Sequence, residues 1–406
     1  MFETCIIIGA GQAAGQLSVS LRSEGFDGRI IVIGEEPYQP YQRPPLSKHY
    51  LAGSVGLERV YFRPDDFYEK AEVELMLDTR VITIDRARRT VVLADGNRLQ
   101  YDKLALATGS RVRRLTLPGS ELQGLLYLRT LDDGNALRAR LESGSKLVIV
   151  GGGYIGLEVA SIAVKQGVEV TVLEMEDRLM SRTATPTTAD FFKRLHHAAG
   201  VGIRTNVRVS GFFGTNGRLE AVLCADGTRI PANCALIGIG IEPNSELAAA
   251  AGLETDNGII VDDYARTNDP NIVAAGDCTN HPNASLGRRL RLESVPNALA
   301  QARVAAATLC GIFTPYDEIP WFWSDQYDVK LQIVGLSQGY DQLIVRGDPA
   351  QHSFLVFCFR EQRLLAVEAV NSSKEFIVCK KLLAAEKPIS AEQAADTSIA
   401  LQQLMA

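Results

Sequence analysis

The sequence predicts an α/β fold with two Rossmann-like dinucleotide-binding domains, the second inserted in the first, and a small α+β C-terminal domain. Two similar stretches support this prediction, at 5–21 and 147–164, each with an apolar run, a glycine turn and a helix pattern. A hairpin pattern with an Asp-Gly turn follows each stretch, and antiparallel strand patterns begin after Pro320. The predicted boundaries are 1–113 with 241–319 for the first domain, 114–240 for the second and 320–406 for the third.

The first glycine turn lies in CIIIGAGQAAGQLSVSL, between a strand pattern and a helix pattern. Gly9 and Gly11 occupy two fingerprint positions, and Ala14 occupies the third, where a small residue allows close helix–strand packing. The N–H groups at the start of such a helix favour the negative charge of a pyrophosphate. Glu35 follows the next strand pattern, where a carboxylate can bind ribose hydroxyls. These residues predict a bound dinucleotide.

The second glycine turn, GGGYIG, is the more complete match and predicts a second dinucleotide. Its residues are Gly151, Gly153, Tyr154, Ile155 and Gly156. Glu174 follows the next strand pattern, as Glu35 does in the first copy. A carboxylate there repels the 2′-phosphate of NADPH, by roughly 4 kcal/mol for two unit charges about 4 Å apart at an effective dielectric of 20. Even a screened value of ~2 kcal/mol corresponds to about a thirty-fold preference, so we expect NADH.

Later segments indicate how the two copies are connected. LALATG at 104–109 and ALIGIG at 235–240 match as the closing buried strands of the two copies. A further strand pattern, TNDPNIVAAGDC at 267–278, comes after the second copy and suits the first domain. We therefore expect the chain to leave the first domain near Arg113 and to return near Ile241.

The last part of the chain predicts a third, antiparallel domain. Strands are expected in KLQIVGL, QLIVRGD, HSFLVFCFR and RLLAVEAV, a helix in SKEFIVCKKLLAAEK, and a polar end in ISAEQAAD. A separate proline motif, YQRPPLSK at 41–48, reads either as a surface polyproline turn or as a rigid support for a cation, Lys48. Lys48 follows the rigid Pro44-Pro45 pair at the carboxyl edge of a parallel sheet, where ligands bind, so it could stabilise negative charge on a bound ligand.

Composition and charge exclude several classes of function. The net charge of −6 over 406 residues disfavours nucleic-acid and anionic-membrane partners. No stretch approaches about 18 consecutive apolar residues, and no charged leader precedes the first strand pattern, so we expect a cytoplasmic protein. The seven cysteines form no local pair at metal-binding spacing, and we expect reduced thiols and no metal site. They are Cys5, Cys224, Cys234, Cys278, Cys310, Cys358 and Cys379.

Eight stretches spread over nearly the whole chain resemble the FAD-dependent ferredoxin reductases of the putidaredoxin reductase type. They are GAGQAA, YQRPPLSK, YDKLALATGS, LRTLDD, GGGYIGLE, IVAAGDC, ESVPNALAQARVAA and WFWSDQYDVKLQIVG. That family serves bacterial haem-thiolate monooxygenases and Rieske dioxygenases. The resemblance implies a glutathione-reductase-like fold, with FAD in the first domain and NADH in the second. One mild departure is Ala14, where many FAD folds have a third glycine.

The resemblance also implies roles for individual residues. Those expected to contact FAD are Ala13, Glu35, Lys48, Val81, Arg129, Asp277 and Val295. Asp277 would bind the ribityl chain, Arg129 would lie near the adenosine, and Pro45 would pack on the flavin ring. Lys48 would pair with Glu158 beside the flavin N5 atom. In the second domain Tyr154 would cover the nicotinamide site until NADH arrives.

A two-iron ferredoxin is the implied electron acceptor. Trp323 would lie near the flavin, on the face where the ferredoxin docks. An acidic ferredoxin would need a local basic patch despite the overall negative charge. The candidates for this patch are Arg303, Lys330, Lys380 and Lys381.

The predicted function is electron transfer from NADH through FAD to a ferredoxin that feeds an oxygenase. NADH gives up two electrons together and a ferredoxin accepts one, and a flavin can exchange electrons with both. A pyridine nucleotide–disulfide reductase would need a flavin-side cysteine pair, and an NADH oxidase-like flavoenzyme a single flavin-side cysteine. Only Cys5 precedes Cys224, which argues against both. An NADH-sensing interaction module resembling apoptosis-inducing factor stays a further alternative.

Overall fold

The computed structural model describes residues 3–405, which form two compact units. The first unit contains the chain up to Arg43, together with Gly56–Arg111 and Ile241–Glu318. The second contains Pro44–Val55, Val112–Gly240 and the chain from Ile319 onward. The chain thus passes from the first unit to the second and back twice before the final crossing. The finer division into three domains stays a prediction.

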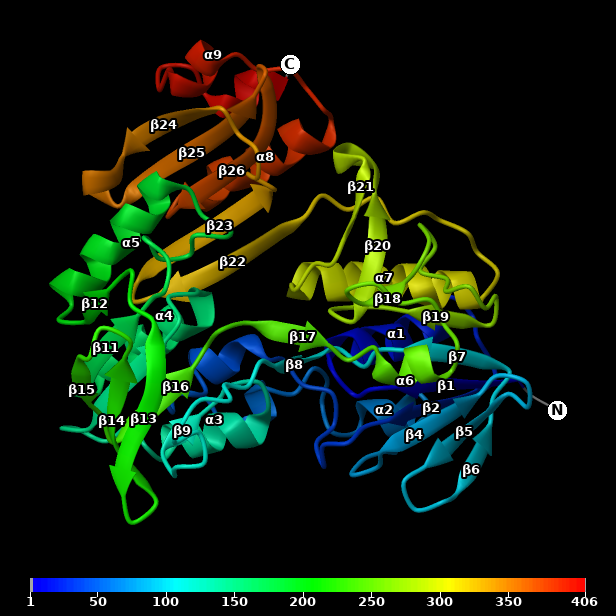
Figure 1. The fold of residues 1–406 in the computed structure, drawn as a ribbon. Helices are drawn as coiled ribbons and strands as arrows, with labels where there is room; N and C mark the ends of the chain where they lie inside the picture. The colour runs from blue at the N-terminus through cyan, green and yellow to red at the C-terminus, as the bar shows by residue number, and fades with distance from the viewer. Residues whose placement is uncertain (1–2, 406) are drawn as a thin grey trace. The chain divides into compact units, whose positions relative to one another are not determined.

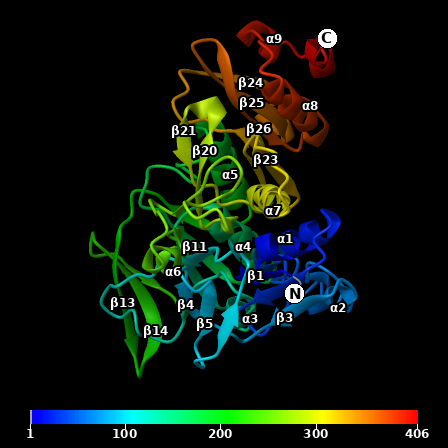
Figure 2. The same ribbon diagram turned by 90° about the vertical axis from the view of Figure 1, so that its right-hand side faces the viewer.

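A five-stranded parallel sheet forms the centre of the first unit. In spatial order its strands are β19 (Ile272–Ala274), β7 (Lys103–Leu106), β1 (Thr4–Ile8), β2 (Arg29–Ile33) and β3 (Val73–Met76). After their first residues, β1, β2 and β7 are runs of apolar residues buried on both faces, as is typical of parallel sheets. Helices α1 (Gln12–Ser23) and α7 (Val295–Leu309) lie side by side against this core (Figures 1 and 2).

The edge strand β19 confirms that the second dinucleotide-binding copy is inserted in the first. It comes after residues 112–240 in the sequence, yet it pairs in parallel with β7. The turn that carries Asp277 directly follows β19, so it returns to the same sheet edge as the first glycine turn. Residues that precede the inserted segment and residues that follow it therefore lie at the carboxyl ends of strands of the same sheet.

The remaining elements of the first unit are shorter. The predicted hairpin after the parallel core is present, as β5 (Thr90–Leu93) and β6 (Arg98–Gln100) beside β4 (Val81–Asp85). The other elements are η2 (Leu57–Arg59), α2 (Phe67–Lys70), β8 (Ser110–Val112), whose last residue belongs to the second unit, β17 (Ile241–Pro243), α6 (Glu246–Ala250), β18 (Ile259–Ile260), β20 (Thr279–Asn283), η3 (Ala284–Leu286) and β21 (Arg288–Leu290).

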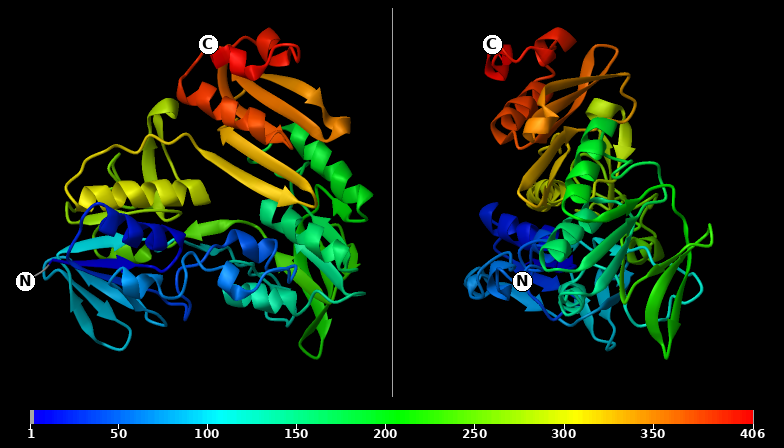
Figure 3. Two further views of the ribbon diagram at one scale, coloured as in Figure 1. Left: turned by 180° about the vertical axis from the view of Figure 1, so that it is seen from behind. Right: turned by 90° about the vertical axis from the view of Figure 1, so that its left-hand side faces the viewer.

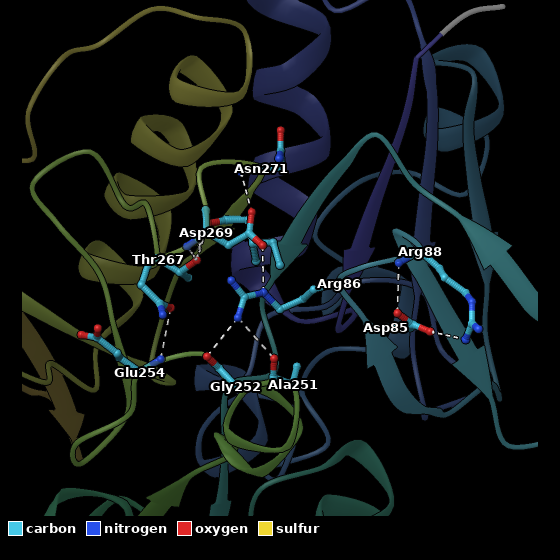
Figure 4. A network of polar contacts seen from close by, with 11 residues as sticks. Asp85, Arg86, Arg88, Ala251, Gly252, Glu254, Thr267, Asp269 and Asn271 are labelled. Atoms are coloured by element: carbon cyan, nitrogen blue, oxygen red, sulfur yellow. Dashed lines mark hydrogen bonds and ion pairs between the residues drawn. The ribbon is translucent and has the colours of Figure 1, made fainter.

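Arg86 joins this antiparallel sheet to the segment that returns from the insertion (Figure 4). Its Nε atom donates to Asp269 Oδ2 at 2.8 Å, and its Nη1 atom donates to the carbonyls of Gly252 and Ala251. Burial acts to raise the pKa of Asp269, but hydrogen bonds from Arg86 and from the Asn271 N–H hold that pKa below its usual value. The returning segment is therefore fixed by a charged pair as well as by β19.

The second unit repeats the parallel plan. Its strands in spatial order are β12 (Gly202–Arg204), β11 (Glu169–Leu173), β10 (Lys146–Val150), β16 (Cys234–Ile237) and β9 (Leu125–Leu126). The predicted second hairpin is β14 (Arg218–Cys224) with β15 (Arg229–Pro231), beside β13 (Val209–Thr215). The helices are η1 (Pro44–Ser47), α3 (Leu131–Arg138), α4 (Tyr154–Lys165) and α5 (Pro186–Ala198).

The same unit contains a five-stranded antiparallel sheet with α8 (Ser373–Ala384) packed on one face (Figure 3). Its strands in spatial order are β22 (Trp321–Gln326), β23 (Val329–Gly335), β26 (Arg363–Val370), β25 (Ser353–Arg360) and β24 (Gln342–Asp348). Four of these strands and the helix were predicted, and β22 was not. The element η4 (Pro349–Gln351) connects β24 to β25.

The prediction of a polar end at ISAEQAAD is wrong. These residues form α9 (Ala391–Ala395), which begins with a capping box between Ser390 and Gln393, and η5 (Leu401–Met405) follows. The side chains of Ile389, Ala394 and Leu401 are buried. Apolar residues spaced among polar ones here cover the core beneath α8 and β24, so the tail is part of the folded unit.

Within residues 3–405 no helix is long and apolar enough to cross a bilayer. The same part of the chain has no group of three or more potential metal-ligating side chains. The seven cysteines are free thiols, and six of them are buried.

Candidate functional site

The first glycine turn has the shape of a phosphate cradle. Gly9 follows β1 with φ +108°, and a Cβ atom on it would lie 2.2 Å from the Ala107 carbonyl oxygen. Gly11 is the N-cap of α1, and a Cβ atom on it would meet nothing within 4 Å. Gly9 is thus required by the fold itself, whereas Gly11 leaves open space at a helix N-terminus. Ala13 and Ala14 are buried on the first turn of α1. This geometry fits a pyrophosphate.

The carboxylates expected to bind FAD lie in the same unit. Glu35 follows β2, is exposed, and makes an ion pair with Arg80 at 3.3 Å, whose two side chains are both 68% exposed. Such an exposed pair contributes little to stability and leaves the carboxylate accessible to a ribose. Asp277 follows β19, and its Oδ2 atom accepts a hydrogen bond from Ser110 Oγ at 2.9 Å. Val81 begins β4 and Val295 begins α7.

The second glycine turn repeats this cradle. Gly151 has φ +108°, and a Cβ atom on it would lie 2.3 Å from the Gly238 carbonyl oxygen. Gly153 is the N-cap of α4 with open space around it. A Cβ atom on Gly156 would lie 2.9 Å from the Gly151 oxygen and from the Ile149 side chain, so this position needs glycine for helix–strand packing. These are the three roles of a dinucleotide fingerprint.

Glu174 is held at the end of β11 by main-chain donors. Its Oε2 atom accepts from the Gly152 N–H at 2.6 Å, inside the glycine turn, and its Oε1 atom accepts from the Glu176 N–H at 2.9 Å. The carboxylate is therefore oriented by the backbone beside the turn that would hold the phosphates. A ribose hydroxyl can donate to it there, whereas a 2′-phosphate would meet its negative charge.

Lys48 and Glu158 form the ion pair that was expected. Lys48 Nζ lies 2.8 Å from Glu158 Oε2, and the two side chains are 12% and 5% exposed. The preceding residues 44–47 form the 3₁₀ turn η1, not a polyproline turn, and Pro45 lies within it. Glu158 Oε2 also accepts from Ser47 Oγ at 2.5 Å, and Glu158 Oε1 accepts from Ser324 Oγ at 2.7 Å. The carboxylate thus has three polar partners in a largely dry setting.

Tyr154 and Ile155 begin helix α4 directly after Gly153. Thr183 Oγ1 donates to the Tyr154 hydroxyl at 3.0 Å, and the Tyr154 ring meets the Phe322 ring edge-on with centroids 4.9 Å apart. Burial raises the pKa of the Tyr154 phenol, so it stays neutral at physiological pH. Ile155 is 47% exposed at the mouth of the turn. An aromatic ring and an apolar side chain therefore flank the start of the helix.

Two further residues of the expected FAD site, Arg129 near the adenosine and Trp323 near the flavin, belong to the second unit. Arg129 precedes α3, and its main-chain N–H donates to Asp133 Oδ2 at 2.9 Å. Trp323 lies in β22 with its ring 5.8 Å from the ring of Trp321. Glu35, Val81, Asp277 and Val295 belong to the first unit instead. Lys48 and Glu158 are therefore in direct contact, and the other expected FAD residues are divided between the two units.

The proposed docking residues differ in their surroundings. Lys330 is exposed, and its Nζ atom lies 3.4 Å from Asp325 Oδ1. Lys380 lies over the Trp321 ring, 5.2 Å from its centroid. Lys381 is exposed on α8 in the second unit, and Arg303 is exposed on α7 in the first. Of the proposed docking residues in the second unit, Lys380 is the one with a cation–aromatic contact described here, to Trp321.

Sequence reasoning missed several polar partners. Ser47, Ser324 and Thr183 were not singled out, although Ser47 is adjacent to Lys48 in the chain. Glu368 was also missed, although a lone carboxylate in the apolar run RLLAVEAV was a visible signal. It is fully buried, and both of its oxygens accept from Thr185, the N-cap of α5, at 2.7 Å. This contact joins the antiparallel sheet to the segment that contains Thr183.

Replacing Glu368 by Gln should change how stability depends on pH. Burial raises the pKa of the Glu368 carboxyl above its ordinary value of about 4.5, although hydrogen bonds from Thr188 and Thr185 oppose this shift. The folded chain therefore binds this proton more tightly than the unfolded chain. The free energy of unfolding of the wild type should fall relative to that of Glu368→Gln as pH rises above about 4.5 through the raised pKa. Urea unfolding of both proteins from about pH 4 to about pH 8 checks this, and a constant difference would contradict it.

Comparison with known proteins agrees with this geometry over the full length of the chain. Residues 3–302 match the pyridine nucleotide-disulphide oxidoreductase family, and residues 321–405 match a reductase C-terminal domain family. The chain is 43% identical to putidaredoxin reductase CamA of Pseudomonas putida, covering 100% of this chain and 97% of that protein. It is 45% identical to rhodocoxin reductase of Rhodococcus erythropolis, covering 99% and 94%.

Two solved structures share its fold. A ferredoxin reductase for the CYP199A2 system from Rhodopseudomonas palustris matches with a TM-score of 0.97, 43% identity and coverage of 100% of both chains. The reductase in a covalent putidaredoxin reductase–putidaredoxin complex matches with a TM-score of 0.97 and 43% identity, covering 99% of this chain and 98% of that one. The chain therefore belongs to the FAD- and NADH-dependent ferredoxin reductases of the putidaredoxin reductase type.

Proposed function

We propose that FAD binds at the first glycine turn, that NADH binds at the second, and that electrons leave to a two-iron ferredoxin that feeds an oxygenase. The observation that supports this most is the duplicated cradle, in which Gly11 and Gly153 both leave open space at a helix N-terminus. The reduced, mostly buried cysteines fit a cytoplasmic location, which forms part of the proposal.

In the first unit the chain binds and orients FAD. The N-terminus of α1 favours the pyrophosphate, Glu35 accepts from ribose hydroxyls, and Asp277 binds the ribityl chain. Ala13, Val81 and Val295 of this unit complete the proposed contacts, and Arg129 of the second unit is proposed to lie near the adenosine. FAD, when bound, accepts a hydride from NADH and releases single electrons.

In the second unit the chain holds NADH and prepares the site for hydride transfer. Glu174 accepts from the adenosine ribose, and Tyr154, fixed by Thr183, covers the nicotinamide site. Lys48 supplies a buried positive charge, and Glu158 holds its ammonium group in place. If FAD binds with its ring near this pair, the fixed positive charge of Lys48 would favour electron gain by the flavin. No side chain needs to act as an acid or a base.

The acceptor would dock against basic and aromatic side chains. Lys380 with its aromatic neighbours, Lys381, Lys330 and Arg303 are the proposed contacts, together with Trp323. Charge complementarity of this kind mainly raises the association rate and is screened by salt.

Nicotinamide preference tests the assignment of the second turn. The wild type should use NADH at least about thirty-fold more efficiently than NADPH, because Glu174 opposes a 2′-phosphate. Glu174→Ala should lower the ratio of kcat/KM with NADH to kcat/KM with NADPH, because kcat/KM with NADPH should rise. The measurement is kcat/KM for both cofactors with a saturating two-iron ferredoxin, and Glu176→Ala, whose main-chain donor is kept, is the matched control. Equal efficiencies in the wild type would refute the role of Glu174.

A further inference from the structure

Glu158 is the end point of a chain of buried hydrogen bonds that runs away from Lys48. Ser324 Oγ donates to Glu158 Oε1 at 2.7 Å, and Gln326 Nε2 donates to Ser324 Oγ at 3.1 Å. Gln326 Oε1 lies 2.8 Å from His196 Nε2, and His196 Nδ1 lies 2.9 Å from the Tyr327 hydroxyl. All of these residues belong to the second unit.

The carboxylate determines the direction of every bond in this chain. Since a carboxylate only accepts, the single proton of Ser324 points to Glu158, and Ser324 can then only accept from Gln326. The amide of Gln326 therefore turns its NH₂ group to Ser324 and its oxygen to His196. An amide oxygen only accepts, so His196 carries its proton on Nε2. All donors point toward Glu158.

Burial is consistent with this arrangement. Ser324, Gln326 and His196 are fully buried. Burial lowers the pKa of His196 to about 4, against a weaker opposing effect of the Gln326 hydrogen bond. A neutral imidazole with Nε2 protonated has a free Nδ1 that accepts from Tyr327, which closes the chain. Hydrogen bonds aligned in one direction in a dry interior polarise one another, so the chain stabilises negative charge on Glu158.

We propose that Ser324, Gln326 and His196 are positioning residues for hydride transfer, which hold the Glu158 carboxylate so that its Oε2 atom stays on Lys48. This inference rests on the proposed role of the Lys48–Glu158 pair at the flavin. Ser324 and Gln326 alternate along β22 with Trp323 and Asp325, so one face of this strand holds the ion pair. The antiparallel sheet is thereby connected directly to the group that assists hydride transfer.

The test measures the rate constant for flavin reduction by NADH in the FAD-loaded protein, together with the dissociation constant for NADH. Ser324→Ala should slow reduction about tenfold with unchanged NADH affinity, because Glu158 loses one buried donor. Ser324→Thr keeps the hydroxyl and should restore the rate. Ser372→Ala, which removes a buried hydroxyl bonded to the Val370 carbonyl, is the matched control and should behave as the wild type.

Gln326→Leu keeps the inference testable if Ser324→Ala does not fold. It leaves every direct partner of Glu158 in place and should still slow reduction about threefold through Ser324. Ser324→Ala combined with Lys48→Met should be no slower than Lys48→Met alone, because both act through one ion pair. Normal reduction in Ser324→Ala and Gln326→Leu, or additive effects with Lys48→Met, would overturn the positioning role.

Two measurements separate this inference from the proposed function. A normal reduction rate in Lys48→Met would refute the role of the ion pair itself, whereas slow Lys48→Met with normal Ser324→Ala refutes positioning alone. Nitrogen NMR of the protein labelled at histidine reports the direction of the hydrogen bonds at His196 and does not depend on catalysis. His196 should be the neutral Nε2–H tautomer from about pH 6 to about pH 8. An imidazolium or an Nδ1–H tautomer would overturn the proposed direction of the chain.

Discussion

Lys48→Met is expected to slow flavin reduction by NADH by about 10²-fold while FAD stays bound. A fixed charge that stabilises developing charge in a reaction is typically worth that much. Lys48 Nζ lies 2.8 Å from Glu158, and both side chains are largely buried, so the charge is well fixed in place. The free energy of unfolding of the variant should also fall by about 3 kcal/mol, because Glu158 stays buried without its cation. Anaerobic stopped-flow absorbance at the flavin band measures the rate.

The double variant Lys48→Met/Glu158→Gln separates stability from rate. It removes both charges, so the free energy of unfolding should recover most of the loss, while reduction should stay slow because the positive charge is still absent. Full recovery of the rate in the double variant would show that Lys48 serves only to neutralise Glu158. A normal rate in Lys48→Met would contradict the proposed role of the pair.

Gly9→Ala and Gly11→Ala should fail in different ways. A Cβ atom on Gly9 would lie 2.2 Å from the Ala107 carbonyl at φ +108°, so Gly9→Ala should lose the folded first unit and its FAD. A Cβ atom on Gly11 meets no protein atom within 4 Å, so the apoprotein should fold normally. If that open space receives the pyrophosphate, Gly11→Ala should bind FAD at least about tenfold more weakly. Thermal unfolding of the apoprotein and FAD titration measure the two effects.

The second turn supplies the control for this comparison. Gly153→Ala in the open position of α4 should keep FAD and raise the dissociation constant for NADH. FAD affinity in Gly11→Ala equal to that of the wild type would show that this turn serves helix packing alone. If Gly153→Ala lost FAD and still bound NADH normally, the second turn would be the FAD site and the first turn the NADH site.

The parallel core could be predicted because its signals are local. A glycine turn with positive φ, an aliphatic strand before it and a small-residue helix after it are all adjacent in sequence, as at Gly151. The return of β19 to the first sheet was also predictable, since the copy before it was already complete. The grouping of Pro44–Val55 with the second unit was not, because it depends on packing of η1 against α4 across more than 100 residues of sequence.

The C-terminal part shows where pattern reasoning fails. In β22 the aromatic residues indicate a functional surface, and the alternation of Trp323 with buried Ser324 is too short a signal to predict a strand. In the tail, Ile389 and Ala394 are buried, but the polar residues around them made the stretch resemble a solvated segment. A short helix that covers a core needs only a few apolar side chains, so its sequence resembles a solvated end.

The site was predictable only in part for the same reason. The Lys48–Glu158 pair followed from a family resemblance, and no spacing rule connects these residues. The bond from Ser324 to Glu158 joins positions 166 apart in sequence. A serine is a common residue in loops and strands, and only the fold shows that its hydroxyl meets a buried carboxylate.

This chain is expected to divide the two electrons of NADH between two ferredoxin molecules. The most direct test mixes the FAD-loaded protein with one equivalent of NADH and an excess of oxidised two-iron ferredoxin, without oxygen. We expect two ferredoxins to be reduced per NADH, at a rate that falls as ionic strength rises. Flavin that is reduced by NADH yet passes no electrons to any two-iron ferredoxin would contradict it.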